Sequence, residues 1–174
     1  MADGAASTGE RTALGVDAVP PSLVRAAHDE YCMRLALADA EAAAAAGDVP
    51  VGAVIVRGDA VVAHAANRTV RDQDPTAHAE LIVMRAAAKA LGTWRLEGCT
   101  LVVTLEPCAM CAGAIVLARV PRVVFGAWDD KAGMAGSVED LLRHHRLNHR
   151  PEVSGGVLEA AAGALLQRFF AARR

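Results

Sequence analysis

Residues 100–111 read Thr-Leu-Val-Val-Thr-Leu-Glu-Pro-Cys-Ala-Met-Cys, and they combine the signals of two kinds of secondary structure. Thr100 to Leu105 is a short run of apolar and β-branched residues, which is typical of a buried strand. Pro107 follows at a position suited to the first turn of a helix, because proline lacks only an N–H that this turn leaves unpaired anyway. We therefore expect a strand that leads directly into a helix from Cys108 to about Ala118.

The segments on either side of this stretch alternate between helical and strand patterns. Gly58-Asp59 separates two β-rich runs and indicates a hairpin, Thr76 resembles a helix N-cap, and Gly126 is expected to end a strand. The predicted elements are helices at 22–46, 78–91, 138–142 and 158–172, strands at 51–57, 60–66, 120–125 and near 153, and a loop at 67–77. This order indicates an α/β protein, with a central sheet covered by helices on both faces.

The length of 174 residues fits one domain, which we assign to residues 21–174. Residues 1–20 are small and polar without periodicity, and they predict a disordered tail rather than a secretory signal. Alanine inflates the apolar fraction of 53%. The longest nearly apolar run, 108–118, is shorter than the roughly 18–20 residues that a membrane span needs. These features predict a cytoplasmic protein that does not enter a membrane.

The charge of the chain leaves its partner open. A formal net charge of −2 does not suggest a nucleic-acid binder. Residues 143–150 nevertheless hold three arginines and three histidines, and the chain ends in Arg173-Arg174. A modest basic region is therefore present near the C-terminus.

Three residues have the spacing of a catalytic zinc site. Cys108 and Cys111 lie three apart in the first turn of a predicted helix, so their side chains project from the same face. The positive end of that helix favours the thiolate that zinc binds. His78 opens another predicted helix and supplies a third ligand, which leaves the fourth tetrahedral position for water. Glu80, two residues after His78, is the candidate carrier of protons between this water and a substrate.

Each half of this pattern has an ordinary alternative. A Cys-x-x-Cys pair alone is equally consistent with redox chemistry or packing, and a lone His-x-Glu is common on helix surfaces. Cys32 and Cys99 are single, which excludes a structural site with four cysteine ligands. The combination of residues 78–80 with Pro107-Cys108-x-x-Cys111 is far more specific, and it is the signature of zinc deaminases.

The chain resembles the bacterial tRNA-specific adenosine deaminases, within the cytidine deaminase-like superfamily, from about His28 to the C-terminus. This resemblance implies a three-layer α/β/α fold around a mixed five-stranded sheet. It also implies hydrolysis of adenosine to inosine at the wobble position of a tRNA anticodon, one Zn²⁺ per chain, no organic cofactor, a homodimer, and the anticodon stem-loop as partner. The segments that carry the resemblance are 48–54, 74–80, 104–114, 122–127, 135–137, 147–150 and 169–170.

The resemblance also assigns roles to individual residues. It implies that backbone donors near Ala79 and Cys108 hold the tetrahedral intermediate, and that Asn67 binds the nucleoside. It places four further residues against the RNA: Asp129, Lys131, Asn148 and Phe170. Considered without the resemblance, Asn67 and Asn148 are turn residues, Asp129 is a solvated loop acid, and Phe170 is a core residue. Trp128 departs from relatives, which often carry a basic residue there, and either stacking on a base or packing is consistent with it.

Two other functions fit the same residues. A deaminase of free bases or nucleosides, such as guanine or cytosine, would keep the zinc residues and lose the basic C-terminal region. A non-catalytic RNA-binding subunit on a deaminase scaffold would have no use for Glu80, so the presence of this residue argues against that function. A redox protein is a more distant alternative.

Overall fold

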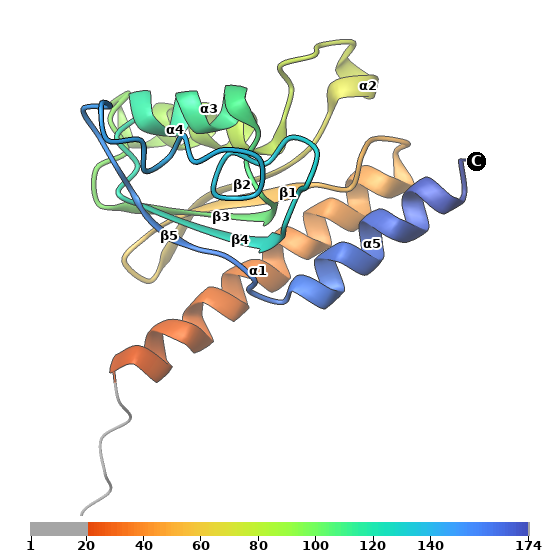
Figure 1. The fold of residues 1–174 in the computed structure, drawn as a ribbon, viewed down its shortest axis with the longest axis horizontal. Helices are drawn as coiled ribbons and strands as arrows, with labels where there is room; N and C mark the ends of the chain where they lie inside the picture. The colour runs from red at the N-terminus through yellow and green to blue at the C-terminus, as the bar shows by residue number, and fades with distance from the viewer. Residues whose placement is uncertain (1–20, 174) are drawn as a thin grey trace, which may run out of the picture.

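The computed structural model describes residues 21–173. Their five strands form one mixed sheet in the order β2-β1-β3-β4-β5, in which β1 runs antiparallel to β2 and β3, and β3, β4 and β5 are parallel (Figure 1). The elements are α1 (Pro21–Ala45), β1 (Gly52–Arg57), β2 (Ala60–Ala66), α2 (Thr69–Asp72), α3 (Ala79–Leu91), β3 (Cys99–Leu105), α4 (Ala109–Leu117), β4 (Arg122–Ala127), β5 (Glu152–Ser154) and α5 (Glu159–Ala171).

Helices cover both faces of the sheet, α1 and α5 on one side and α3 and α4 on the other (Figure 1). Side chains of a strand alternate between the two faces, and the strand residues divide accordingly. Val54 in β1 and Val102 in β3 pack with α1, whereas Ile55 and Val103 pack with α3 and α4. The predicted three-layer α/β/α architecture with a mixed five-stranded sheet is confirmed. The predicted tail at 1–20 lies outside the described residues.

Helix α1 is held against the sheet by a close approach and by an ion pair. At Gly52 a Cβ atom would come 1.9 Å from the carbonyl oxygen of Ala36, so only glycine lets the strand and the helix lie this close. Arg122 at the start of β4 donates two hydrogen bonds to the Asp29 carboxylate, at 2.7 and 2.6 Å. This bidentate pair is largely buried and connects α1 to the centre of the sheet.

Two predicted helix and strand limits were wrong, each for a local reason. Thr76 does not cap α3; its backbone N–H and its hydroxyl donate to the side chain of Asp74, and His78 occupies the N-cap position. Gly126 lies within β4 rather than ending it. A Cβ atom at Gly126 would meet the backbone of Thr104 at 2.7 Å, so this glycine permits close packing and does not mark a turn.

Two predictions between the main elements also failed. The predicted loop at 67–77 contains the short helix α2. The helix predicted at 138–142 is absent, and the segment instead folds back on its own loop. Leu141 and Leu142 donate their N–H groups to the carbonyl of Met134, and an isolated bridge joins Ala135 to Asp140. Tertiary hydrogen bonds therefore override a weak local helical pattern.

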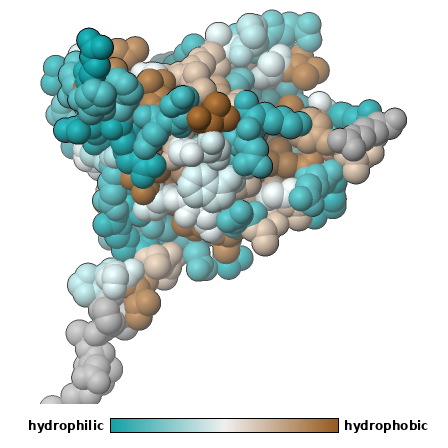
Figure 2. All heavy atoms as spheres, in the orientation of Figure 1, coloured by the Kyte–Doolittle hydropathy of each residue, from teal (hydrophilic) through white to brown (hydrophobic). Residues whose placement is uncertain are grey.

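The surface of the molecule is mixed in character. On the face shown in Figure 2, hydrophobic residues form small patches between hydrophilic ones, which is usual for a folded domain because apolar atoms always contribute much of the surface. None of the helices within residues 21–173 is long and apolar enough to span a bilayer.

Candidate active site

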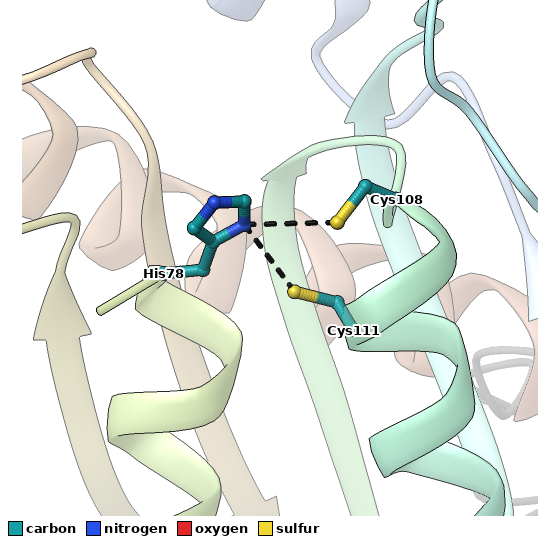
Figure 3. Close-up of side chains that lie close together, drawn as sticks. All are labelled: His78, Cys108 and Cys111. Atoms are coloured by element: carbon teal, nitrogen blue, oxygen red, sulfur yellow. Dashed lines mark hydrogen bonds between the residues drawn. The ribbon is translucent and has the colours of Figure 1, made fainter. Parts of the chain in front are cut away.

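The three predicted metal ligands lie together at the N-terminal ends of two helices (Figure 3). His78 is the N-cap of α3, Cys108 is the N-cap of α4, and Cys111 follows in the first turn of α4. The Nδ1 atom of His78 lies 3.7 Å from the Sγ atom of Cys108 and 3.5 Å from that of Cys111. All three ligand atoms are within 4.8 Å of one another, so one ion can contact them all.

These separations fit zinc. Zinc binds sulfur at about 2.3 Å and histidine nitrogen at about 2.0 Å, which in a tetrahedron places the two ligand atoms about 3.5 Å apart. The observed separations between His78 and the two cysteines, 3.5 and 3.7 Å, are close to this value. Three protein ligands also leave one tetrahedral position free for a water molecule, as in catalytic zinc sites. The predicted ligand set His78, Cys108 and Cys111 therefore forms a geometrically competent centre.

Hydrogen bonds among the three ligands favour the thiolate at Cys108 and the protonated forms of Cys111 and His78. A hydrogen bond with Cys111, together with the nearby His78, lowers the pKa of the Cys108 thiol to about 3 against the opposing effect of burial. The pKa of the Cys111 thiol is raised, because it supplies that hydrogen bond and is itself buried. The hydrogen bond to Cys108 raises the pKa of His78. Zinc binds cysteine as the thiolate and histidine as the neutral imidazole, so metal binding at these residues would release protons.

Glu80, in the first turn of α3, lines the same cavity as His78 and Cys108. Its side chain is buried, with 4% of the residue exposed, and this burial raises the pKa of the carboxyl group. A buried carboxyl group with a raised pKa is suited to hold and release a proton near neutral pH. Glu80 is not part of the metal-ligand cluster. The geometry fits the proton-carrying role that the sequence indicates for Glu80.

A cavity of about 260 Å³ opens directly onto these groups. Asn67 at the end of β2 and Asp129 after β4 both line it, so the structure brings two of the predicted substrate residues beside His78 and Glu80. Thr69 donates its hydroxyl hydrogen to the Asn67 side-chain oxygen at 3.2 Å, which leaves the amide NH₂ of Asn67 available to a ligand. The remaining lining residues are Val49, Val51, Thr69, Val70, Leu105, Glu106, Cys108 and Ala132.

Glu106 has a structural role at this cavity that the sequence did not predict. Its buried carboxylate accepts hydrogen bonds from the backbone N–H groups of Asp129, Ala135 and Ser137, and from the Ser137 hydroxyl. Burial raises the pKa of Glu106, but these four hydrogen bonds outweigh it and lower the pKa overall. Glu106 thereby fixes the loop that carries Asp129. The signal in the sequence was an acid placed between a buried strand and Pro107.

Asp48 is a second buried acid that supports the cavity wall. It is fully buried and accepts the backbone N–H of Val70 at 2.6 Å, at the start of α2. Its other oxygen has no hydrogen-bond partner among the described residues, and Arg71 lies 3.7 Å from it. This contact holds Thr69 and Val70 of α2 against the cavity. An acid at the end of a predicted helix gave no such signal in the sequence.

Three of the predicted RNA-binding residues lie outside this cavity. Lys131 and Phe170 line a separate hollow of about 520 Å³ between the 128–137 loop and α5, and Phe170 is 49% exposed rather than in the core. Asn148 lies beyond the end of α4, where both its backbone carbonyl and its side-chain oxygen accept hydrogen bonds from Arg119. The roles assigned to these residues stay predictions.

The family is decided by comparison with known proteins. Residues 26–127 match the model of the cytidine and deoxycytidylate deaminase zinc-binding region. The chain is 52% identical over 142 residues to the tRNA-specific adenosine deaminase of Bacillus subtilis, an alignment that covers 82% of this chain and 88% of that protein. The chain belongs to the tRNA-specific adenosine deaminase family. The predicted resemblance is thereby confirmed, and with it a hydrolytic deaminase of the zinc-dependent cytidine deaminase superfamily.

Solved structures agree with this family assignment. A tRNA:A34 deaminase studied for A-to-I editing at the wobble position superposes with a TM-score of 0.76 at 43% identity, covering 78% of this chain and 99% of that one. Guanine deaminase from Nitrosomonas europaea superposes with a TM-score of 0.72 at 29% identity, covering 94% and 100%. The deaminases of this fold therefore include enzymes with different substrates, so the fold alone does not determine the substrate.

Proposed function

We propose that this protein deaminates adenosine to inosine at the wobble position of a tRNA anticodon. Water contributes the oxygen that replaces the exocyclic nitrogen at C6 of adenine, and the nitrogen leaves as ammonia. The observation that supports this reaction best is one cavity lined by two of the three ligands, His78 and Cys108, and also by Glu80, Asn67 and Asp129. The high identity to tRNA-specific adenosine deaminases over most of the chain agrees with it.

The residues of the cavity have three different roles: metal binding, proton transfer and stabilisation of negative charge. When bound to His78, Cys108 and Cys111, zinc supplies a water molecule whose pKa falls toward about 7. The buried Glu80 takes a proton from the attacking water and delivers protons to the ring nitrogen and then to the leaving amine. Backbone N–H groups near Ala79 and Cys108, at the positive ends of α3 and α4, face the oxygen that gains negative charge.

Asn67 and Asp129 hold the nucleoside rather than react with it. The amide NH₂ of Asn67 donates to the substrate, since the amide oxygen already accepts from Thr69. One oxygen of Asp129 accepts backbone N–H groups of its own turn, from Lys131 at 3.0 Å and Ala132 at 3.3 Å. The other oxygen is available for a ribose 2′-hydroxyl, a group that DNA lacks. We infer a preference for RNA over DNA from this contact.

The test is a comparison of substrates. Purified protein with measured zinc content is incubated with a tRNA that has adenosine at the wobble position, and separately with free adenosine, cytosine and guanine. The expected result is inosine at the wobble position, stoichiometric ammonia, and no turnover of free bases. A matched tRNA with guanosine at that position reports any reaction at other adenosines. Ammonia from guanine without inosine in tRNA would instead assign the protein to the free-base deaminases.

We propose one zinc ion per chain, a homodimer and a cytoplasmic location as further parts of this function. The ligand cluster is the only group of its kind within residues 21–173, which supports one ion per chain. Leu117 on α4 is 74% exposed, more than any other large hydrophobic residue within residues 21–173. This exposure supports an apolar contact between α4 and a second copy of the chain. Light scattering tests this: Leu117→Glu is expected to yield a monomer, whereas Val61→Glu, at another exposed hydrophobic residue, is not.

A further inference from the structure

We propose that a hollow between the 127–130 loop and α5 binds the base of a nucleotide next to the target adenosine, with Trp128 as its stacking surface. This inference rests on the proposed function, because it concerns the same RNA substrate. The hollow measures about 550 Å³ and is separate from the active-site cavity. Its lining includes Trp128 and Asp130 of the loop and Glu159, Ala160, Gly163 and Ala164 of α5.

The hollow adjoins the active site through consecutive residues of one loop. Asp129 lines the cavity that contains His78 and Glu80, and its two neighbours Trp128 and Asp130 line the hollow. Consecutive Cα atoms are about 3.8 Å apart. The loop is therefore the wall between the two spaces. A nucleotide strand whose target base enters the cavity presents its neighbouring base to the other side of this wall.

Trp128 has the properties of a fixed stacking surface. The residue is 45% exposed and lines the hollow, so it is accessible to a ligand there. Its indole is held in place: the ring centroid lies 4.7 Å from that of Phe125, edge to face, and a Cβ atom at Gly155 would come 2.9 Å from the indole. A side chain held in this way loses little entropy on binding. Proteins that bind single-stranded RNA stack unpaired bases on such exposed aromatic residues.

The floor of the hollow is shaped by small residues. Ala160, Gly163 and Ala164 are spaced three and four apart on α5 and so share one face of the helix. At Gly163 a Cβ atom would meet nothing within 4 Å, so the space above this residue is open. The result is a shallow surface opposite Trp128 that accepts a flat group.

The charges of the hollow favour a base over a phosphate. Asp130 and Glu159 are carboxylates on its rim, and they repel a phosphate but accept hydrogen bonds from the amino and imino groups of a base. The adjoining hollow, which shares Gln167, carries Lys131 and Arg173 instead. The two hollows therefore match the two parts of a nucleotide, the base against Trp128 and the backbone phosphate near the two cations.

The first experiment uses the fluorescence of Trp128. The chain contains two tryptophans, and Trp94 lies in a different region, beside Leu117 and Arg119. In the Trp94→Phe variant, Trp128 is the only source of tryptophan emission. We expect an anticodon stem-loop RNA to quench this emission, and the same RNA with an abasic site on the stacking side of the target to leave it unquenched. Equal quenching by the intact RNA and by RNAs abasic at either neighbouring position would overturn the proposal.

The second experiment measures coupling between the protein and the base. Trp128→Leu, which keeps an apolar side chain against Phe125, is expected to lower kcat/KM on the intact RNA by about 5- to 150-fold, the usual effect of losing one stacked base. On the abasic RNA the same substitution is expected to change nothing further. Gly163→Leu, which fills the hollow, is expected to act in the same way. An equal loss on both RNAs would show that Trp128 only packs.

The two proposals fail differently. If the wild-type protein forms no inosine in any RNA, the proposed function fails, while base-dependent quenching of Trp128 still supports the binding site. If inosine forms normally and Trp128→Leu has no effect on either RNA, the wobble deaminase stands and the base-binding hollow is refuted.

Discussion

The carboxylate of Glu106 lies against the backbone of Gly133, so that a Cβ atom at position 133 would come 2.2 Å from the carboxylate oxygen. Gly133 also donates its N–H to the carbonyl of Asp129 at 2.9 Å. The loop that carries Asp129 into the cavity therefore closes around a buried acid with no room for a side chain at this position. Loop shape and site geometry depend on the same contact.

Gly133→Ala is expected to disturb this loop. The added methyl group must displace either the Glu106 carboxylate or the backbone of Asp129, and such overpacking usually costs about 1–3 kcal/mol. We expect a lower melting temperature and a higher KM for tRNA, because Asp129 and Lys131 belong to this loop and would be displaced with it. Gly113→Ala in α4 is the control, because a Cβ atom there meets nothing within 4 Å. An unchanged melting temperature and KM for Gly133→Ala would contradict the structural role of the contact.

The hydrogen bonds to Glu106 also predict how stability depends on pH. The pKa of Glu106 is lower in the folded protein than its ordinary value, so the unfolded chain binds a proton more readily. Its contribution to stability is fully present above the ordinary glutamate pKa of about 4.3. The contribution is lost as the pH falls through the lower folded value.

Thermal unfolding at a series of pH values checks this. The wild-type protein is expected to lose more stability than Glu106→Gln between pH 5 and pH 3, because glutamine does not titrate. The two proteins are compared with the zinc content measured at each pH. Parallel curves for the two proteins would show that Glu106 is not the group responsible.

Most of the fold was accessible from the sequence, and the exceptions share a cause. The strand and helix around residues 100–118 were predicted because local pattern and tertiary environment agree there. The helix predicted at 138–142 failed because Leu141 and Leu142 bond to Met134 across the loop. Gly126 was mistaken for a strand end because its packing against Thr104 is a contact between neighbouring strands that no local window contains.

The site divides in the same way. The zinc-site residues lie at fixed short spacings at the starts of two helices: His78 and Glu80 in one, Cys108 and Cys111 in the other. Such spacings can be recognised directly in the sequence. Glu106 and Asp48 act on segments 23 and 22 residues away, through backbone N–H groups. Backbone donors carry no residue identity, so these contacts leave no pattern that spacing alone detects.

Variants at Glu80 and at Cys111 are expected to differ in their effects: one should lower turnover alone, and the other should lower both turnover and zinc binding. Glu80→Gln keeps the size of the side chain but carries no titratable proton, so turnover should fall by at least about 100-fold, the usual contribution of a general acid or base. Zinc should stay near one per chain, since Glu80 lies outside the ligand cluster. Cys111→Ser should lower both zinc content and turnover. The measurement is zinc by mass spectrometry beside inosine formation; loss of zinc in Glu80→Gln would refute the assigned role.

The ion pair between Arg122 and Asp29 predicts a stability effect that depends on which partner is removed. Arg122 and Asp29 are 14% and 10% exposed in their side chains. Removing one partner leaves a buried charge without compensation, so Arg122→Met alone is expected to destabilise the protein by about 3–5 kcal/mol. Asp29 and Arg122 replaced together, by leucine and methionine, should recover most of that loss, because two apolar side chains avoid the desolvation of both charges.

Urea unfolding of the wild type, the two single variants and the double variant measures this coupling. The arginine also contacts Glu152 at 3.7 Å, so the cycle reports chiefly, though not solely, on the shorter pair. Additive single effects would mean that the two side chains contribute independently and that α1 is held mainly by the close approach at Gly52. A coupling of several kcal/mol would instead make the charged pair the principal link between α1 and β4, on the face of the sheet opposite the zinc site.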